Sequence, residues 1–167
     1  MQRSRRARTT PAVAYDMQGL IFAAATDDGE VKLYDARGYD KGPFNTIAIG
    51  GAKGAVDPAT GKRPRVTTAK FSDDGNDLMC VAGGMVYIHS AFTPFEEVMR
   101  IDVAKETGGS GGKHAGGLEA LDLEACWTPD GQYVLSGGAD SRVHVWSVRS
   151  GSKVTTWQSR HAGVPSS

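Results

Sequence analysis

The sequence has few cysteines, no net charge and no long apolar segment. Its two cysteines, Cys80 and Cys126, lie in apolar stretches and are expected to be buried free thiols, although a disulfide between them stays open. Lys and Arg together number 19, as do Asp and Glu, so the chain as a whole lacks the positive charge typical of nucleic-acid-binding domains. No apolar run approaches the ~20 residues that a membrane-spanning helix requires.

Sequence signs of secretion and of metal chemistry are missing as well. Asn45 and Asn76, the two asparagines, lack the Ser or Thr two positions on that glycosylation requires. Segment 1–10 holds four arginines and no apolar core, which favours a disordered basic tail over a secretory signal and leaves a transit-like or nuclear-type signal as the alternative. The four histidines show no His-x-x-x-His spacing and the cysteines no Cys-x-x-Cys spacing, so we predict no metal site. We also predict no cofactor and no catalytic residue, because the paired carboxylates lie in turns and no Gly-x-Ser-x-Gly nucleophile motif occurs.

Glycine, in contrast, is abundant, and the chain carries a repeat. The 22 glycines indicate many tight turns in place of long helices. Tyr15, Phe71 and Trp127 recur at intervals of 56 residues, and each precedes a four-residue turn that ends in glycine. A period of this kind is the sequence signature of a repeat architecture.

Each repeat continues with the same succession of strand patterns. After the turn come a short apolar run, a second turn, and an alternating segment, which reads EVKLYD at 30–35, MVYIHS at 85–90 and RVHVWS at 142–147. Alternation with a period of two is typical of strands, and a further apolar stretch closes each unit. We therefore predict an all-β fold in which each unit of about 40 residues forms a four-stranded antiparallel propeller blade.

These patterns divide the chain into three blades, two insertions and a tail. The insertions are rich in Gly, Pro and charge and show no periodicity, which is typical of surface loops. The predicted ranges are a basic tail at 1–10, blades at 11–50, 65–104 and 123–160, and insertions at 51–64 and 105–122.

The third blade has the residue spacing of a WD repeat. Asp140 stands six residues before Trp146, and Ser147 replaces the final Asp of the motif. Ser136 and His114 are candidates for the side-chain hydrogen-bond network, although His114 lies further upstream than is usual. The aromatic side chain is expected to fill the wide part of a wedge-shaped blade, and the aspartate to hold the turn.

The other two blades carry weaker versions of this motif. Asp28 stands six residues before Tyr34 in the first blade, and the second blade has His89 in the aromatic position with no aspartate before it. His144 alternates with apolar residues in the third blade and is expected to lie on the surface.

Several segments together resemble one family. Residues 19–44 read GLIFAAATDDGEVKLYDARGYDKGPF, and KFSDDG at 70–75, LEACWTPDG at 123–131 and HVWSVRSGSKV at 144–154 follow in order. They are similar to the WD-repeat subunit shared by the COMPASS histone methyltransferase and the nuclear 3′-end-processing or phosphatase complexes. The chain resembles only the C-terminal part of that subunit.

The resemblance implies a function as well as a fold. It implies a propeller of seven blades that is not an enzyme and that serves as a scaffold in nuclear complexes acting with RNA polymerase II. The implied partners are a histone lysine methyltransferase, a cleavage and polyadenylation factor, a regulator of protein phosphatase one, or the phosphorylated polymerase tail. Three blades do not close a ring of four to eight, so the open blade faces are expected to promote association.

A partner surface is expected in the loop that follows the third strand of the first blade. Arg37, Tyr39, Asp40, Lys41 and Phe44 combine charge with aromatic side chains there. Arg37 and Lys41 could bind a phosphorylated peptide through charge-assisted hydrogen bonds. The alternative is a turn packed for blade geometry, with Tyr39 partly buried and Phe44 entering the fourth strand.

Other partner residues and functions stay open at this stage. Arg142 is a weaker candidate for partner binding, and the arginines of segment 1–10 could contact nucleic acid nonspecifically. The function predicted from the sequence is a scaffold in a nuclear chromatin and transcription complex. The alternatives are an unrelated WD-repeat adaptor and a nucleic-acid contact through the tail.

Overall fold

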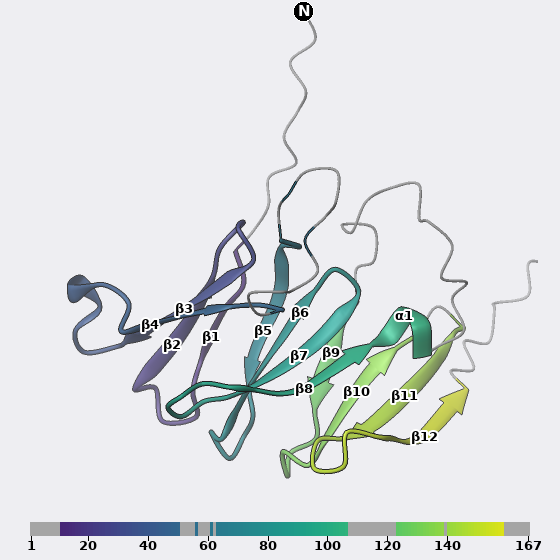
Figure 1. Cartoon of the computed structure of the whole chain (residues 1–167). Helices are drawn as coiled ribbons and strands as arrows, with labels where there is room; N and C mark the ends of the chain where they lie inside the picture. Colours follow the sequence, from purple (N-terminus) through teal and green to yellow (C-terminus); the bar gives the residue numbers. More distant parts are fainter. Residues whose placement is uncertain are drawn as a thin grey trace, which may run out of the picture.

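The computed structural model describes residues 11–50, 56, 61, 63–106, 123–138 and 140–158. Within these ranges the chain forms three four-stranded sheets, which stand side by side in chain order (Figure 1). The first sheet consists of β1 (Val13–Tyr15), β2 (Ile21–Ala25), β3 (Glu30–Asp35) and β4 (Asn45–Ala48). The second consists of β5 (Val66–Phe71), β6 (Asp77–Ala82), β7 (Met85–Ser90) and β8 (Glu97–Asp102). The third consists of β9 (Ala125–Trp127), β10 (Tyr133–Gly137), β11 (Arg142–Ser147) and β12 (Lys153–Gln158).

Each sheet is an antiparallel meander in which every strand pairs with the next one along the chain. The predicted fold class is therefore confirmed: the described residues form three consecutive four-stranded antiparallel sheets, as neighbouring propeller blades do. Two short helical turns are exceptions to this all-β structure in the described residues, namely η1 (Tyr39–Lys41) and α1 (Val103–Glu106). Because most of segments 51–64 and 105–122 lies outside the described residues, the exact blade boundaries stay a prediction.

The repeated turn after the first strand of each sheet has the expected chemistry. Gly19, Gly75 and Gly131 end these turns with φ angles of 67°, 72° and 67°, which is left-handed backbone that favours glycine. An aspartate side chain closes each turn by accepting a hydrogen bond from a backbone N–H, as Asp16 does from Leu20 at 2.8 Å. The strands are thus held in register by local sequence.

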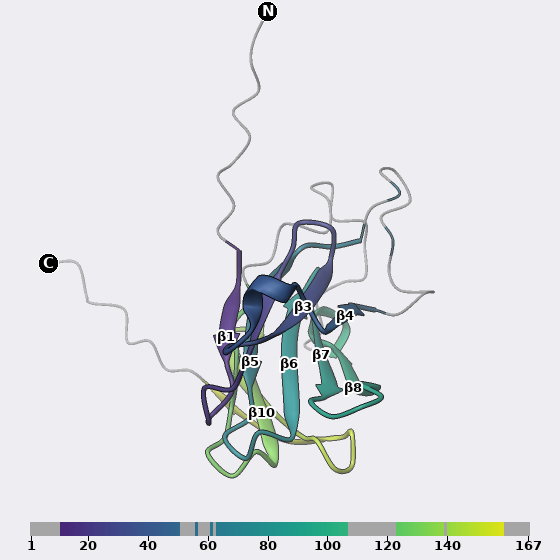
Figure 2. The same cartoon turned by 90° about the vertical axis from the view of Figure 1, so that its left-hand side faces the viewer.

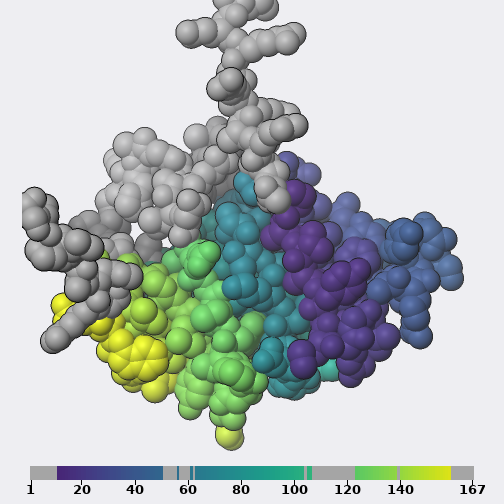
Figure 3. Space-filling model, turned by 180° about the vertical axis from the view of Figure 1, so that it is seen from behind, coloured from purple at the N-terminus to yellow at the C-terminus, as the bar shows by residue number. Residues whose placement is uncertain are grey.

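The three sheets are arranged like part of a fan. Strands β1, β5 and β9 lie next to one another along one side of the molecule, as Figure 3 shows from behind. Strands β4 and β8 lie at the other edge of their sheets, away from β1 and β5 (Figure 2). This is the arrangement of neighbouring blades around a propeller axis.

The second sheet is buried on both faces. One core joins it to the first sheet through Leu33, Leu78 and Tyr87. A second core joins it to the third sheet through Ile88 and Trp146, among others. Strands β6 and β7 are consequently buried along almost their whole length, whereas among the described residues the first and third sheets each have a neighbouring sheet on one face.

Polar contacts also join the sheets. The Nζ atom of Lys70 on β5 donates to the Ala125 carbonyl on β9 at 3.0 Å, and Trp127 Nε1 donates back to the Lys70 carbonyl at 3.1 Å. Arg100 on β8 reaches the Gly50 carbonyl at 3.3 Å. These bonds satisfy backbone groups at the sheet boundaries and align neighbouring sheets.

The turn between β2 and β3 fits closely against the start of the second sheet. Gly29 has a φ of 71°, and a Cβ atom there would lie 2.6 Å from the Arg63 Cβ and 2.8 Å from the Pro64 carbonyl oxygen. Only glycine fits this close approach. Arg65 and Asp27 form an ion pair at 3.6 Å beside it.

Replacing Ile88 with alanine is expected to destabilise the chain by about 2–5 kcal/mol, because Ile88 is fully buried between the second and third sheets and truncation leaves a cavity. Urea unfolding followed by tryptophan fluorescence measures the change. The control, Val98→Ala on the neighbouring strand β8, removes a side chain that is 53% exposed and is expected to change stability by less than about 0.5 kcal/mol. Equal losses for the two variants would contradict the packing described.

Candidate partner-binding surface

The loop between β3 and β4 is a compact structure that projects from the edge of the first sheet (Figure 1). Asp35 begins it by accepting a hydrogen bond from the Arg37 N–H at 2.8 Å. The η1 turn follows, and Gly42, with a φ of 87°, returns the chain toward β4. The loop is thus ordered by its own backbone and not by burial, since none of the η1 residues is buried.

Aromatic side chains from two neighbouring sheets meet at this loop. Phe44 lies 6.2 Å from Phe95, centroid to centroid, with the rings tilted by 47°. Phe95 belongs to the loop between β7 and β8, which corresponds to the β3–β4 loop in the next blade. Tyr39, Phe44 and Phe92 are 65%, 51% and 60% exposed. We name Tyr39, Phe44, Phe92 and Phe95 the aromatic loop surface.

Charged residues of both signs border the aromatic loop surface. Arg37, Asp40 and Lys41 are exposed on the loop. Arg37 pairs with Asp35 at 3.7 Å, but both side chains are more than half exposed, so the pair contributes little to stability. The two cations therefore stay accessible to an anionic ligand.

The structure corrects one expectation about this loop and brings the β7–β8 loop, with Phe92 and Phe95, next to it through the contact of Phe44 with Phe95. Tyr39 is not partly buried: it is 65% exposed, because the η1 turn projects from the edge of the first sheet (Figure 1). Phe44 ends the loop immediately before β4, and its N–H donates to the Leu33 carbonyl at 2.9 Å. Sequence reasoning missed Phe92 and Phe95 as site residues; their position after the third strand of the second blade was the available signal.

Arg142 lies away from the other predicted partner residues. It is the first residue of β11, next to the β10–β11 turn, and it is exposed. That turn corresponds to the β2–β3 turn, at the opposite end of β3 from the loop with Arg37 and Phe44. The structure therefore does not bring Arg142 to the aromatic loop surface.

The predicted blade residues occupy different environments. Trp146 is buried between the second and third sheets, and its Nε1 donates to Glu106 Oε2 at 3.4 Å. Tyr34 is half-buried and stacks on Phe22, with centroids 4.9 Å apart and planes within 7°. Asp28 is exposed in the β2–β3 turn. His114 and the arginines of segment 1–10 lie outside the described residues.

Asp140 and His144 form the centre of a hydrogen-bond network in the third sheet. His144 Nε2 lies 3.0 and 3.1 Å from the two carboxylate oxygens of Asp140, and its Nδ1 lies 3.2 Å from Thr156 Oγ1. The carboxylate of Asp140 can only accept, so Nε2–H of the ring donates to it, and Nδ1 shares a hydrogen bond with the Thr156 hydroxyl. The network ties the β10–β11 turn to the last strand.

The expectation that His144 lies on the surface is wrong, because it is only 3% exposed. Strand alternation does place His144 opposite to Val143 and Val145, as expected. The second sheet covers the face that carries His144 and Trp146, whereas no other sheet of the described residues lies on the opposite face, where Val145 is nevertheless buried. The direction of the side chain followed from the strand pattern, whereas the covered face depends on the neighbouring sheet.

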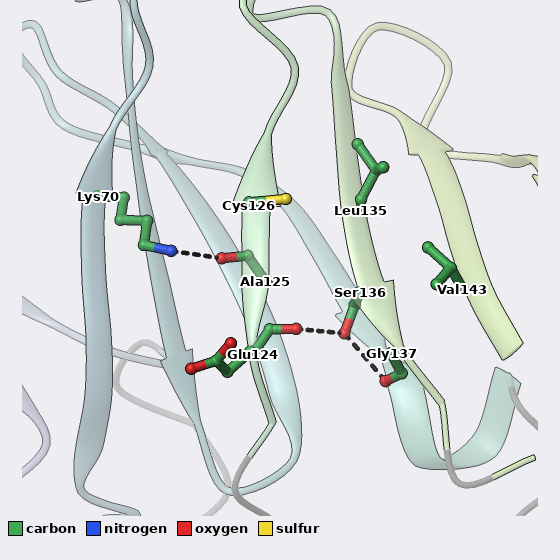
Figure 4. Close-up of a pocket in the computed structure, with 8 residues that line it drawn as sticks. All are labelled: Lys70, Glu124, Ala125, Cys126, Leu135, Ser136, Gly137 and Val143. Atoms are coloured by element: carbon green, nitrogen blue, oxygen red, sulfur yellow. Dashed lines mark hydrogen bonds between the residues drawn. The ribbon is translucent and has the colours of Figure 1, made fainter. Parts of the chain in front are cut away.

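A shallow open hollow of about 260 Å³ lies beside β9 and β10. Figure 4 shows Lys70 and Cys126 among its lining residues, together with Ser136, whose hydroxyl donates to the Glu124 carbonyl at 2.9 Å. Cys126 is exposed, so its predicted burial is wrong, whereas Cys80 is a buried free thiol with a pKa raised to about 12 by desolvation. The exposed thiol lies on the face of the third sheet that points away from the second sheet.

Among the described residues, no group of three or more His, Cys, Asp or Glu side chains gathers as metal ligands would. In the same part of the chain, no helix has the length and apolar character needed to cross a membrane.

The comparisons with known proteins agree with the fold. The family model for the WD domain, G-beta repeat, matches residues 113–147. Protein ANTHESIS POMOTING FACTOR 1 of Arabidopsis thaliana is 39% identical over 90% of this chain and 39% of its own length. WD repeat-containing protein 82 of Drosophila melanogaster is 35% identical over 92% of this chain and 42% of its own length.

Two further matches are more distant. COMPASS component SWD2 of Saccharomyces cerevisiae is 28% identical over 81% of this chain and 36% of its own length. A crystal structure of RRP9 WD40 repeats superposes with a TM-score of 0.63 at 13% identity, over 94% of this chain and 41% of that chain, which shows the fold alone. The chain spans less than half the length of each of these relatives.

The Asp140 network predicts a specific pH dependence. The pKa of the Asp140 carboxyl is lowered, chiefly by the hydrogen bond from His144 and further by the Arg142 N–H. A carboxyl whose pKa is lower in the folded state than in the unfolded state stabilises the fold at pH values above the ordinary Asp pKa. This contribution is lost as the pH falls through the folded-state pKa. Asp140→Asn should therefore show a smaller loss of unfolding free energy than the unmodified chain between neutral pH and about pH 3.

Urea unfolding across this pH range measures the difference. The control is Asp40→Asn, which changes a carboxylate exposed on the β3–β4 loop. This variant should lose as much unfolding free energy in acid as the unmodified chain. If Asp140→Asn and the unmodified chain lose the same stability in acid, the Asp140–His144 interaction is not the one described.

Proposed function

Because the chain folds as part of a WD-repeat propeller, we propose that it is a non-catalytic scaffold that binds protein partners in a nuclear complex linked to chromatin and transcription. WD-repeat proteins typically bind proteins and do not catalyse reactions, which supports the general role. The specific setting is supported by the similarity to WD repeat-containing protein 82 and to the yeast protein named as a COMPASS component.

One observation carries the proposal, namely the aromatic loop surface. It exposes Tyr39 and Phe44 on the β3–β4 loop and Phe92 on the β7–β8 loop, and the two loops meet where the Phe44 ring lies against the Phe95 ring. Large aromatic side chains that gather in solvent typically mark a surface that a partner covers, and tyrosine is enriched among the residues that dominate binding energy. The β3–β4 loop also lies within segment 19–44, which resembles the family most clearly.

The charges beside this surface indicate the partner's chemistry. Arg37 and Lys41 border Tyr39, and Arg37 is held only by a weak, exposed ion pair. An extended peptide with apolar side chains and a phosphorylated or acidic residue would satisfy both the aromatic side chains and the cations. Asp40 between them would repel a peptide that is acidic along its whole length.

Pull-down from nuclear extract, followed by mass spectrometry, tests whether the chain binds subunits of a chromatin or transcription complex. Recovery of histone methyltransferase, phosphatase or cleavage-complex subunits supports the proposal, and recovery of unrelated proteins supports a different WD-repeat adaptor. Recovery that nuclease abolishes, and that requires segment 1–10, supports the contact with nucleic acid.

Replacing both Tyr39 and Phe92 with alanine tests the surface itself. Each is more than half exposed, so the fold should keep its stability while partner affinity falls by more than about 30-fold, which corresponds to about 2 kcal/mol for loss of dominant contacts. Titration of a recovered partner by calorimetry measures the change. The control Val154→Ala removes a side chain that is 55% exposed on β12, and it should bind normally. Unchanged affinity in the double variant would exclude this surface.

A further inference from the structure

His89 is a titratable side chain buried where the first and second sheets pack together. It lies on β7 and is 4% exposed. Strand alternation places it on the same face as Tyr87, which belongs to the core that joins the second sheet to the first. Its cross-strand partner on β6, Leu78, belongs to the same core. The imidazole is therefore enclosed between two sheets.

Only one of the two imidazole nitrogens has a hydrogen-bond partner. Nδ1 of His89 lies 3.4 Å from the Phe95 carbonyl oxygen, which can only accept, so Nδ1 carries a proton. Nε2 is buried and has no hydrogen-bond partner among the described residues. A second proton there would place a charged N–H in the core without an acceptor. The arrangement thus holds the ring in its neutral form, with the lone pair on Nε2.

The residue that His89 holds has an unusual backbone conformation. Phe95 has a φ of 59°, which is left-handed backbone that bulky side chains rarely adopt. Its N–H donates to the Phe92 carbonyl at 2.6 Å, and its ring lies against the Phe44 ring. Such conformations persist where the surrounding contacts impose them, and they cluster at functional sites. His89 supplies the contact that reaches Phe95 from the interior.

The repeat shows that His89 occupies the position of a large aromatic ring. It corresponds to Tyr34 in the first sheet and to Trp146 in the third. Trp146 fills this position between the second and third sheets with an indole, which does not titrate. The middle sheet instead carries a ring that can change its charge within a few pH units of neutrality.

We propose that His89 is the positioning residue of the aromatic loop surface. In its neutral form it holds the Phe95 carbonyl, and so keeps the Phe95 ring against Phe44 and the two loops together. Protonation adds a charge at Nε2, where no described residue accepts a hydrogen bond, so the ring must turn toward water and release Phe95. The inference rests on the proposed function, because it names how that partner surface is held and regulated.

The charges around His89 leave burial as the main influence on it. Burial lowers the pKa of His89; the bond to Phe95 and the charge of Glu97 act in the opposite direction, and Arg100 adds to the lowering. Glu97 and Arg100 on β8 are paired with each other at 2.8 Å. The other charged side chains on the elements around His89 at this end of the sheets are Asp77 on β6, Glu96 in the β7–β8 loop, Asp35 at the end of β3, and Arg37, Asp40 and Lys41 in the β3–β4 loop.

Fluorine NMR of the full chain labelled with 4-fluorophenylalanine tests the proposal without any partner. As the pH falls from about 7.5 to about 5, the signals of Phe44 and Phe95 should shift together along a one-proton curve. The midpoint should lie below the ordinary histidine pKa of about 6.5. Phe22, which stacks on Tyr34 on the opposite face of the first sheet, is the internal control and should not shift.

Two variants separate the hydrogen bond from the charge. His89→Asn keeps an amide N–H in place of Nδ1–H but cannot be protonated, so the Phe95 signal should stay at its neutral position across the pH range. His89→Leu removes the donor and keeps an apolar side chain, so the signal should stand at its released position even at about pH 7.5. The matched control is His144→Gln, at the other buried histidine of the described residues, which should keep the full pH-dependent shift.

Signals of Phe44 and Phe95 that do not move with pH in the unmodified chain would overturn the proposal. So would a shift that survives in His89→Asn, or a Phe95 signal that is the same in His89→Leu and in the unmodified chain at about pH 7.5. These signals are read without a partner, so a chain that shows the expected shifts and recovers no partner would contradict the proposed function alone.

Discussion

The structure depends on one constraint: each sheet is apolar on both faces, so it needs a neighbouring sheet on each side. The second sheet satisfies the constraint within the chain, because the first and third sheets cover it. Burial of β6 and β7 on both faces supplies most of the apolar contact that holds the three sheets together. Polar bonds such as Lys70 to Ala125 then align the sheets and satisfy their backbone groups.

The same constraint connects the fold with function. Since sheet faces are used for packing between blades, recognition falls to the loops that join the strands, and the aromatic loop surface is built in this way from the β3–β4 and β7–β8 loops. Partner recognition and packing between blades therefore use different parts of the molecule.

Much of the fold could be predicted from local sequence, whereas the burial of several side chains could not. The spacing of Tyr15, Phe71 and Trp127 and the glycine-ended turns specify strands, turns and repeat through short-range physics. Strand alternation gives two faces, but it does not say which face a neighbour covers. His144 and Cys126 were assigned wrongly for this reason, since His144 faces the second sheet and Cys126 points away from it. The meeting of Phe44 and Phe95 depends likewise on how two sheets stand together.

Hydrogen exchange measured peptide by peptide tests the central claim most directly, because amide protection reports how often each strand opens. The account predicts that the amides of β6 and β7 exchange most slowly in the chain, since opening them exposes both interfaces at once. Slower exchange in the first or third sheet than in the second, or uniform protection along the chain, would contradict a structure held together by its doubly covered middle sheet.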